Sequence, residues 1–252
     1  MEKEIKMLNL KSARRFCIAM GLVCFVSIAT CLFVLQCCRG VQTLPSPNTN
    51  NPEQITCDDD GFPVVDWEYW QSVNEDVIGW ITIPDTDINY PILKAWPDNN
   101  DYYLKHNVYK DWDLMGAVHV DAECFDKELN SKNCVILGHS LNASGNGSIF
   151  TPLTQYADEG FAKSHQEILI QTPEWKKKVS WFGIQNINGS DAIKVTEFNN
   201  KNQFYSYQED CYNNSDLKLE DKFKYKEQMF TLCTCSYFFN PSNERILIYV
   251  AE

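Results

Sequence analysis

The stretch that decides the fold is MFTLCTCSYFFNPSNERILIYV, residues 229–250. Two apolar runs, 229–234 and 246–250, flank a polar loop, and their β-branched and aromatic residues favour strands. Cys235 follows the first run and Arg245 stands just before the second. A Cys at a strand end is an accessible nucleophile if something nearby stabilises its thiolate, and an Arg supplies both that charge and a fork of donors for an oxyanion. A buried inert Cys and a surface Arg are the alternative interpretation.

A second stretch, CVILGHS at residues 134–140, offers a partner for that Cys. It predicts a strand that leads through Gly138 to His139, and we expect the Gly to permit a sharp exit so that the imidazole projects from the sheet end. A nucleophilic Cys needs a proton-transfer partner, and histidine titrates nearest to neutral pH. His106 and His165 lie in polar surroundings and are expected at the surface. His119 lies in a predicted strand with alternating side chains and is the serious rival for the role.

The rest of the chain after residue 60 consists mostly of short apolar runs separated by turn residues. Nine candidate strands at this spacing predict a mainly β domain, a barrel or a sandwich. Besides the two already quoted, they cover 77–83, 90–93, 115–120, 134–137, 168–172, 179–184 and 192–197. A short amphipathic helix is expected over 64–72, where large apolar residues recur every three positions, and helical insertions are expected at 152–157 and 202–213.

The N-terminal part is different in kind. Residues 16–38 form a run of 23 residues without a charge, close to the roughly 20 residues that a bilayer-spanning helix needs. We therefore expect a cytoplasmic tail at 1–15, a membrane span at 16–38, an extracellular linker at 39–60 and one domain at 61–252. A cleavable signal peptide is the alternative, but its apolar region is only roughly 7–15 residues long and ends in a small-residue cleavage site. Five Lys and Arg residues precede the run and only Arg39 closely follows it, so the positive-inside rule places the domain outside the cytoplasm.

Charge and cysteine content narrow the function. The chain carries 22 Lys and Arg residues and 34 Asp and Glu residues. Six of the Lys and Arg residues and two of the Asp and Glu residues lie in the first 40 positions, so the remainder has a net charge of −16. Such a domain should not bind nucleic acid or an anionic lipid surface through its overall charge, so the acidity serves a cationic partner or solubility. Of the 11 cysteines, six lie beyond the apolar run, where thiols tend to be oxidised, and their spacing matches no zinc site. No metal or organic cofactor is expected.

These stretches together resemble a known family. Thr231-Leu-Cys-Thr-Cys235 looks like the TLxTC motif of sortases, with Arg245 ten positions on at the head of the next strand, and Ile136-Leu-Gly-His139 resembles the histidine motif of that family. Further segments are similar, in order, to the N-terminal half of class B sortases, namely 74–84, 88–92, 102–104 and 116–121. The resemblance covers residues 64–252.

The resemblance implies a closed eight-stranded sortase-type β-barrel, with N-terminal helices and a helical insertion over 199–214 before the strand of the catalytic Cys. It also implies transpeptidation by an enzyme anchored in the cell membrane. Cys235 would attack the carbonyl of a Thr in the C-terminal sorting signal of a secreted protein, and His139 would protonate the departing amine. The thioacyl enzyme would then be resolved by an amine, either of a lipid-linked peptidoglycan precursor or of a pilin lysine.

The same resemblance implies roles for further residues. Arg245 and the backbone N–H of Ser236 would hold the oxyanion. The substrate groove would be lined by Asn100, Leu104 and Cys233.

Two positions depart from the family pattern. Tyr237 stands where some class B sortases have an Asp, so the chain supports a site of Cys, His and Arg without an Asp. Cys233 stands where Ser is more usual, and alternation along a strand would make it the neighbour of Cys235 on one face. Two other functions compete with transpeptidation. One is a secreted cysteine peptidase or amidase that transfers the acyl group to water, and the other is an anchored β-domain that only binds a ligand.

Overall fold

The computed structural model describes residues 56–141, 149–191, 194–236 and 243–252. All of these belong to one compact unit, Ser46–Glu252. The predicted cytoplasmic tail, the predicted membrane span and most of the predicted linker lie outside the described residues, as does Tyr237. Within the described ranges, no helix combines the length and the apolar character needed to cross a membrane.

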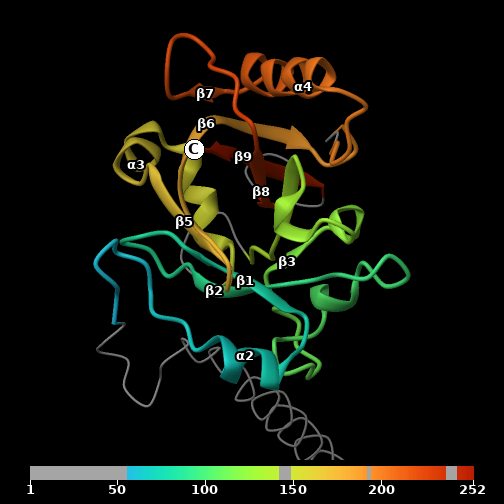
Figure 1. Ribbon diagram of the computed structural model, residues 1–252. Coiled ribbons are helices and arrows are strands. Elements are labelled where there is room, and N and C mark those ends of the chain that lie inside the picture. Colours follow the sequence, from blue (N-terminus) through green and yellow to red (C-terminus); the bar gives the residue numbers. More distant parts are fainter. Residues whose placement is uncertain (1–55, 142–148, 192–193, 237–242) are drawn as a thin grey trace, which may run out of the picture. The chain divides into compact units, whose positions relative to one another are not determined.

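Eight strands close into a barrel, which confirms the predicted fold class (Figure 1). The β4–β8 and β2–β3 pairs are parallel, and the other pairs of the ring are antiparallel. A ninth short strand, β7 (Leu217–Lys218), extends the sheet from β6. The ring closes because β6 pairs back with β5, and its order is β5 (Glu167–Gln171), β1 (Val77–Thr82), β2 (Asn89–Leu93), β3 (His119–Val120), β4 (Asn133–Leu137), β8 (Met229–Cys235), β9 (Glu244–Ala251) and β6 (Lys176–Asn188).

Both faces of the C-terminal strands are buried, which explains their unbroken apolar runs. The face of β8 and β9 that carries Cys233 and Leu247 packs against Phe204 and Cys211 of helix α4 (Lys201–Asn213). Figure 1 shows this helix beside β6 and β7. The alternate residues of the same strands point to the opposite face and fill the barrel. Burial on two sides therefore replaces the apolar and polar alternation of a one-sided sheet.

The predicted helices are present with small changes of boundary. Helix α2 (Trp67–Val73) begins after Asp66, whose carboxylate accepts the N–H of Tyr69 and so caps the first turn. Trp70 is its buried residue. The helical segments elsewhere are α4, the short helix α3 (Glu159–Ser164) and the 3-10 helices η1 (Tyr102–Leu104), η2 (Ala122–Cys124), η3 (Glu128–Asn130) and η4 (Thr151–Ala157).

The strand predicted at 192–197 is wrong over its described part, because 194–197 forms no strand. This segment is held to the barrel by side chains instead of a ladder. Lys194 forms an ion pair with Asp121, and the carbonyl of Val195 accepts the side-chain amide of Asn133 at 2.9 Å. The alternating residues of 194–197 therefore contact the barrel surface without forming a strand.

The strand predicted at 115–120 shrinks to the two residues of β3. Its first half cannot pair because Gly116 has φ of +60°, outside the β region. The N–H of Ala117 then donates to the carbonyl of Tyr103 in η1 at 2.8 Å. The backbone of this segment therefore holds η1 against the barrel, a contact on which the site depends.

Candidate active site

Strand register brings Cys235 and Arg245 together. The two residues are directly paired across the antiparallel β8–β9 ladder, and side chains of paired residues project from the same face. Cys235 is the last residue of β8 and is half-buried, as is Arg245. The sequence prediction that a hairpin-like loop places the guanidinium beside the thiol therefore agrees with the backbone register.

His139 reaches the same end of the sheet from β4. In the parallel β4–β8 ladder Leu137 pairs with Cys233, and the next N–H, that of Gly138, donates to the Cys233 carbonyl at 3.3 Å. The hydroxyl of Thr234 donates back to the Gly138 carbonyl at 2.7 Å. Leu137 and Cys233 are the last pair of the β4–β8 ladder. His139 and Cys235 each lie two residues beyond that pair, so both are at the same edge of the sheet.

Gly138 is required for close packing and not for the expected sharp turn of the chain. Its φ is not in the positive region, where Gly61 and Gly116 lie. A Cβ on Gly138 would instead come within 2.8 Å of the Phe150 ring. The absence of a side chain lets β4 pack against the start of η4, and this packing directs the chain to His139.

The imidazole of His139 is oriented by a backbone carbonyl. Its Nε2 lies 2.8 Å from the carbonyl oxygen of Leu104, which can only accept a hydrogen bond. Nε2 therefore carries the proton, and in the neutral ring Nδ1 is the basic nitrogen. Leu104 accordingly contributes a positioning backbone group, and the predicted role of its side chain in a substrate groove stays a prediction.

Gly116 holds that carbonyl in place. A Cβ at its positive-φ position would lie 3.0 Å from both the carbonyl carbon and the oxygen of Leu104, and closer still to the Tyr103 oxygen. No other residue type fits so close to η1 without moving it. The tautomer of His139 is thus linked to a glycine 23 positions earlier in the chain.

Gly116→Ala is expected to reduce turnover by roughly 10–100-fold, because a displaced Leu104 carbonyl no longer orients His139. The matched control is Gly61→Ala, which also places a side chain at positive φ but meets only the end of Lys178 at 4.0 Å. Steady-state rates and thermal midpoints of both variants separate positioning from backbone strain. Equal losses of activity in the two variants would contradict the assignment.

Arg245 lies against a third close-packed glycine, Gly189, which follows the end of β6. A Cβ on Gly189 would come 3.4 Å from the guanidinium carbon and 2.9 Å from the carbonyl oxygen of Asn243. The guanidinium Nη1 donates to the carbonyl of Glu244 at 3.0 Å, which leaves further donors of the fork for other partners. The positive charge of Arg245 also acts to lower the pKa of the Cys233 thiol on this face of β8.

Arg245→Lys is expected to lower turnover by about 10²–10³-fold, because an ammonium on a flexible stem cannot reproduce the planar fork that would hold an oxyanion. The substrate concentration at half-maximal rate should change less than the maximal rate. Lys194→Arg, at a nearby cation paired with Asp121, serves as the control for a change of basic side chain. A near-wild-type rate for Arg245→Lys would leave the residue with a structural role only.

Ser236 does not have the predicted free donor. Its backbone N–H donates to the carbonyl of Glu244 at 3.2 Å, which extends the β8–β9 ladder by one step. Its hydroxyl is fully buried and has no partner among the described residues. The predicted role of this N–H in holding the oxyanion stays a prediction, and it requires the N–H to leave its bond with the Glu244 carbonyl.

Cys233 is buried next to the site. Its side chain is only 8% exposed and belongs to the cluster beneath α4. Burial raises the pKa of its thiol to about 11, although the nearby charge of Arg245 acts in the opposite direction. The predicted neighbourhood with Cys235 on one face agrees with the strand alternation. The predicted groove-lining role stays a prediction.

Cys233→Ser is expected to change turnover little but to lower the free energy of unfolding by about 1–3 kcal/mol, since a hydroxyl in this apolar cluster loses its hydration without a ready partner. Chemical denaturation measures that loss. The exposed Cys57 supplies the control, because Cys57→Ser should leave both quantities unchanged. A large loss of turnover with unchanged stability would return Cys233 to the substrate path.

The rival histidine, His119, is fully buried. Its Nδ1 lies 2.9 Å from the carbonyl of Ala117, and burial is the main reason that its pKa is lowered. Its backbone pairs with Leu137 on β4, which is two residues before His139. A neutral, enclosed imidazole cannot exchange protons with a substrate at the surface, which favours His139.

Asn100 connects two surface segments near the site. Its side-chain oxygen accepts the N–H of Ala122 at the start of η2 at 2.9 Å, and the residue is half-buried. Its predicted contact with substrate stays a prediction. Within the described ranges, no group of three or more His, Cys, Asp or Glu side chains is arranged to hold a metal ion.

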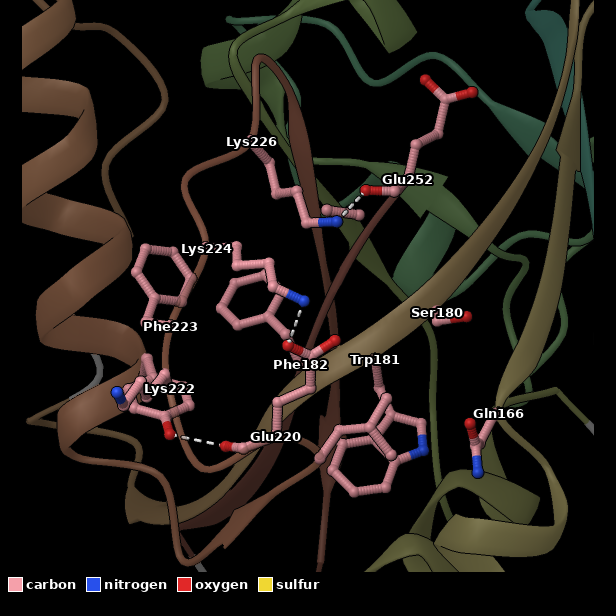
Figure 2. Close-up of a pocket in the computed structure, with 13 residues that line it drawn as sticks. Gln166, Ser180, Trp181, Phe182, Glu220, Lys222, Phe223, Lys224, Lys226 and Glu252 are labelled. Carbon is pink, nitrogen blue, oxygen red and sulfur yellow. Dashed lines mark hydrogen bonds and ion pairs between the residues drawn. The ribbon is translucent and has the colours of Figure 1, made fainter.

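A cavity of about 300 Å³ lies elsewhere on the barrel, between β6, the end of β9 and the 219–226 turn (Figure 2). Its lysines are largely paired, since Lys224 contacts Glu220 at 2.7 Å and Lys226 contacts the carbonyl oxygen of Glu252. It reaches β9 at Ala251, six residues from Arg245 and thus roughly 20 Å along the strand. The cavity is therefore separate from the Cys235 site.

Comparison with known proteins agrees with this geometry. The Sortase domain model matches residues 81–252, about two thirds of the chain. The chain belongs to the sortase family. Sortase B of Listeria monocytogenes is 31% identical over 165 residues, which is 66% of this chain and 65% of that protein. Sortase B of Staphylococcus aureus is 24% identical over 182 residues, 72% of each chain.

Solved sortase structures share the fold. The X-ray structure of Clostridium perfringens sortase B superposes with a TM-score of 0.63 and 27% identity, covering 73% of this chain and 97% of the other. A Staphylococcus aureus sortase B–substrate complex gives a TM-score of 0.62 at 23% identity, covering 73% and 82%. The second likeness concerns the fold alone.

Proposed function

We propose that this sortase is a class B cysteine transpeptidase that cleaves the C-terminal sorting signal of secreted proteins after a Thr and transfers them to an amine. The observation that carries the proposal is the direct pairing of Cys235 with Arg245 across β8 and β9, with His139 at the adjoining end of β4. Family membership supplies the reaction class. The geometry supports a role for each of the three side chains.

In the first half-reaction His139 Nδ1 takes the thiol proton as the sulfur of Cys235 attacks the Thr carbonyl carbon. The C–S bond forms, the carbonyl electron pair moves to oxygen, and Arg245 stabilises that oxyanion. Nε2–H of the resulting imidazolium keeps its hydrogen bond to the Leu104 carbonyl, which stabilises the positive ring. When the oxyanion collapses, the C–N bond breaks and Nδ1–H protonates the departing amine.

In the second half-reaction an incoming amine attacks the thioester carbon while His139 accepts the amine proton. The C–S bond breaks, the proton returns to sulfur, and an amide product leaves. The proposed acceptors are the amine of a lipid-linked peptidoglycan precursor or a pilin lysine. The proposed location is the cell membrane, with residues 16–38 as a single span, the N-terminus in the cytoplasm and the barrel outside.

The test of this proposal is the dependence of the product on an added amine. The full chain in mild detergent is incubated with a synthetic peptide pool that has one fixed Thr between randomised positions, with and without triglycine. A transpeptidase produces the Thr–glycine amide in proportion to triglycine and little acid. A peptidase or amidase would release the same acid at every triglycine concentration, and a binding domain would leave the pool uncleaved.

A further inference from the structure

Two buried thiols outside the active site are close neighbours. Cys124 ends η2 and Cys134 is the second residue of β4, and both side chains are at most 1% exposed. The two side chains are close enough for each thiol to influence the pKa of the other. The sulfur of Cys124 also lies 3.8 Å from the carbonyl oxygen of Asn133, the group bonded to the Cys134 nitrogen. Both belong to the six cysteines of the described ranges, and they lie on two separate segments of the chain.

The turn between β3 and β4 creates this contact. The N–H of Asp121 donates to the Val135 carbonyl at 2.9 Å, which extends the β3–β4 pairing by one residue. The chain then folds back, since the Cys124 N–H donates to the Asp121 carbonyl at 2.8 Å and the Asp121 carboxylate accepts the Glu123 N–H. Cys124 is thus held over the strand by backbone bonds independent of either thiol, so the two sulfurs are positioned before any bond forms between them.

We propose that Cys124 and Cys134 are a disulfide site that cross-links the β3–β4 turn to the strand leading to His139. The oxidant is a disulfide donor of the dithiol-exchange class. One cysteine thiolate attacks the donor, expels one donor thiolate and forms a mixed disulfide. The second cysteine thiolate then attacks the enzyme sulfur of that bond and expels the other donor thiolate. Two electrons pass to the donor, and the two thiol protons end on its two sulfurs.

The neighbouring Cys134 side chain is the main cause of a lowered pKa of the Cys124 thiol, whereas complete burial raises the pKa of the Cys134 thiol. Because both sulfurs are enclosed, exchange takes place during folding or when the turn opens locally. An oxidising environment rests on the proposed location of the barrel outside the cytoplasm, but the chemistry of the pair does not depend on the catalytic role of Cys235.

The bond would close a short loop next to the active site. The same turn carries Asp121, which pairs with Lys194, and Ala122, whose N–H is bound by Asn100. β4, the other end of the cross-link, continues to His139. We therefore expect the disulfide to raise thermal stability and to keep the histidine strand and its neighbouring turn in register, without forming part of the catalytic path.

The test is a non-reducing peptide map of the full chain in mild detergent after unfolding and refolding with a mixture of oxidised and reduced glutathione. Free thiols are alkylated before digestion. Trypsin cuts after Lys127 and Lys132, so the two cysteines fall in separate peptides that only a disulfide can join. We expect the joined pair as the main form, lost after reduction, with a thermal midpoint lowered by roughly 5 °C on reduction.

The control variant is Cys211→Ser, at a buried cysteine that contacts Tyr207 and Tyr249. It should keep the reduction-dependent shift of the thermal midpoint, and Cys134→Ser should lose it. Separate alkylated peptides for Cys124 and Cys134 in the refolded native chain would overturn the proposal, as would a joined peptide with any other cysteine in their place. The peptide map measures no turnover, so a failed transpeptidation assay leaves its result unaffected.

Discussion

Cys235→Ala is expected to reduce transpeptidation by at least about 10⁴-fold while leaving the thermal midpoint almost unchanged. The covalent route disappears with the sulfur, and loss of a nucleophile in other hydrolytic enzymes has effects of this size or larger. The fold should tolerate the change because Cys235 is half-buried at the end of β8 and Ala keeps its Cβ. The rate of amide formation from a Thr-containing peptide pool and triglycine measures the loss.

The control for this variant is Cys57→Ala, which removes an exposed thiol of the same domain. Its rate should equal that of the parent. Substantial turnover by Cys235→Ala would mean that another group is the nucleophile, and an unfolded Cys235→Ala protein would mean that the sulfur serves the core.

His139→Ala is expected to lower turnover by about 10³–10⁴-fold, because the thiol then lacks its base and the leaving amine lacks its acid. The matched variant is His119→Ala, which removes the other imidazole on this side of the sheet. Since His119 is fully buried, its loss should lower the free energy of unfolding by roughly 2–4 kcal/mol through the cavity left behind. The remaining folded His119→Ala enzyme should keep most of its turnover per molecule.

The two histidine variants therefore predict opposite patterns of rate and stability. Kinetics at a temperature well below both thermal midpoints, together with chemical denaturation, distinguish them. If His119→Ala lost turnover and His139→Ala retained it, the acid–base assignment and the role of the Leu104 carbonyl would both be wrong.

The parts of the fold that could be predicted are those with strong local signals. The runs ending at Cys235 and starting after Arg245 are long, apolar and separated by a polar loop, so strand pairing and the meeting of these two residues followed from the sequence. His139 could be chosen because its stretch reads as a strand with an abrupt polar end. In each case the sequence pattern that predicted the strand and its end lies within one continuous segment of the chain.

The features that the sequence did not predict are contacts between distant segments or bonds of backbone groups. Burial of Cys233 depends on Phe204 and Cys211, which approach it only after α4 docks on the sheet. The carbonyl of Leu104 that orients His139 has no side-chain signature, and neither does the bond between Ser236 N–H and the Glu244 carbonyl. Sequence patterns report side chains, so roles played by the backbone required the structure.

If Cys235 is the nucleophile, its sulfur carries a thioacyl intermediate, and peptide mass spectrometry detects that adduct. The full chain is mixed with the Thr-containing peptide pool without an added amine, quenched in acid and digested. We expect a mass increase equal to an acyl fragment ending in Thr, located on the peptide that carries Cys235 and released by hydroxylamine as a hydroxamate. A chain that converts the pool with triglycine but never carries this adduct, or carries it on another residue, would contradict the account.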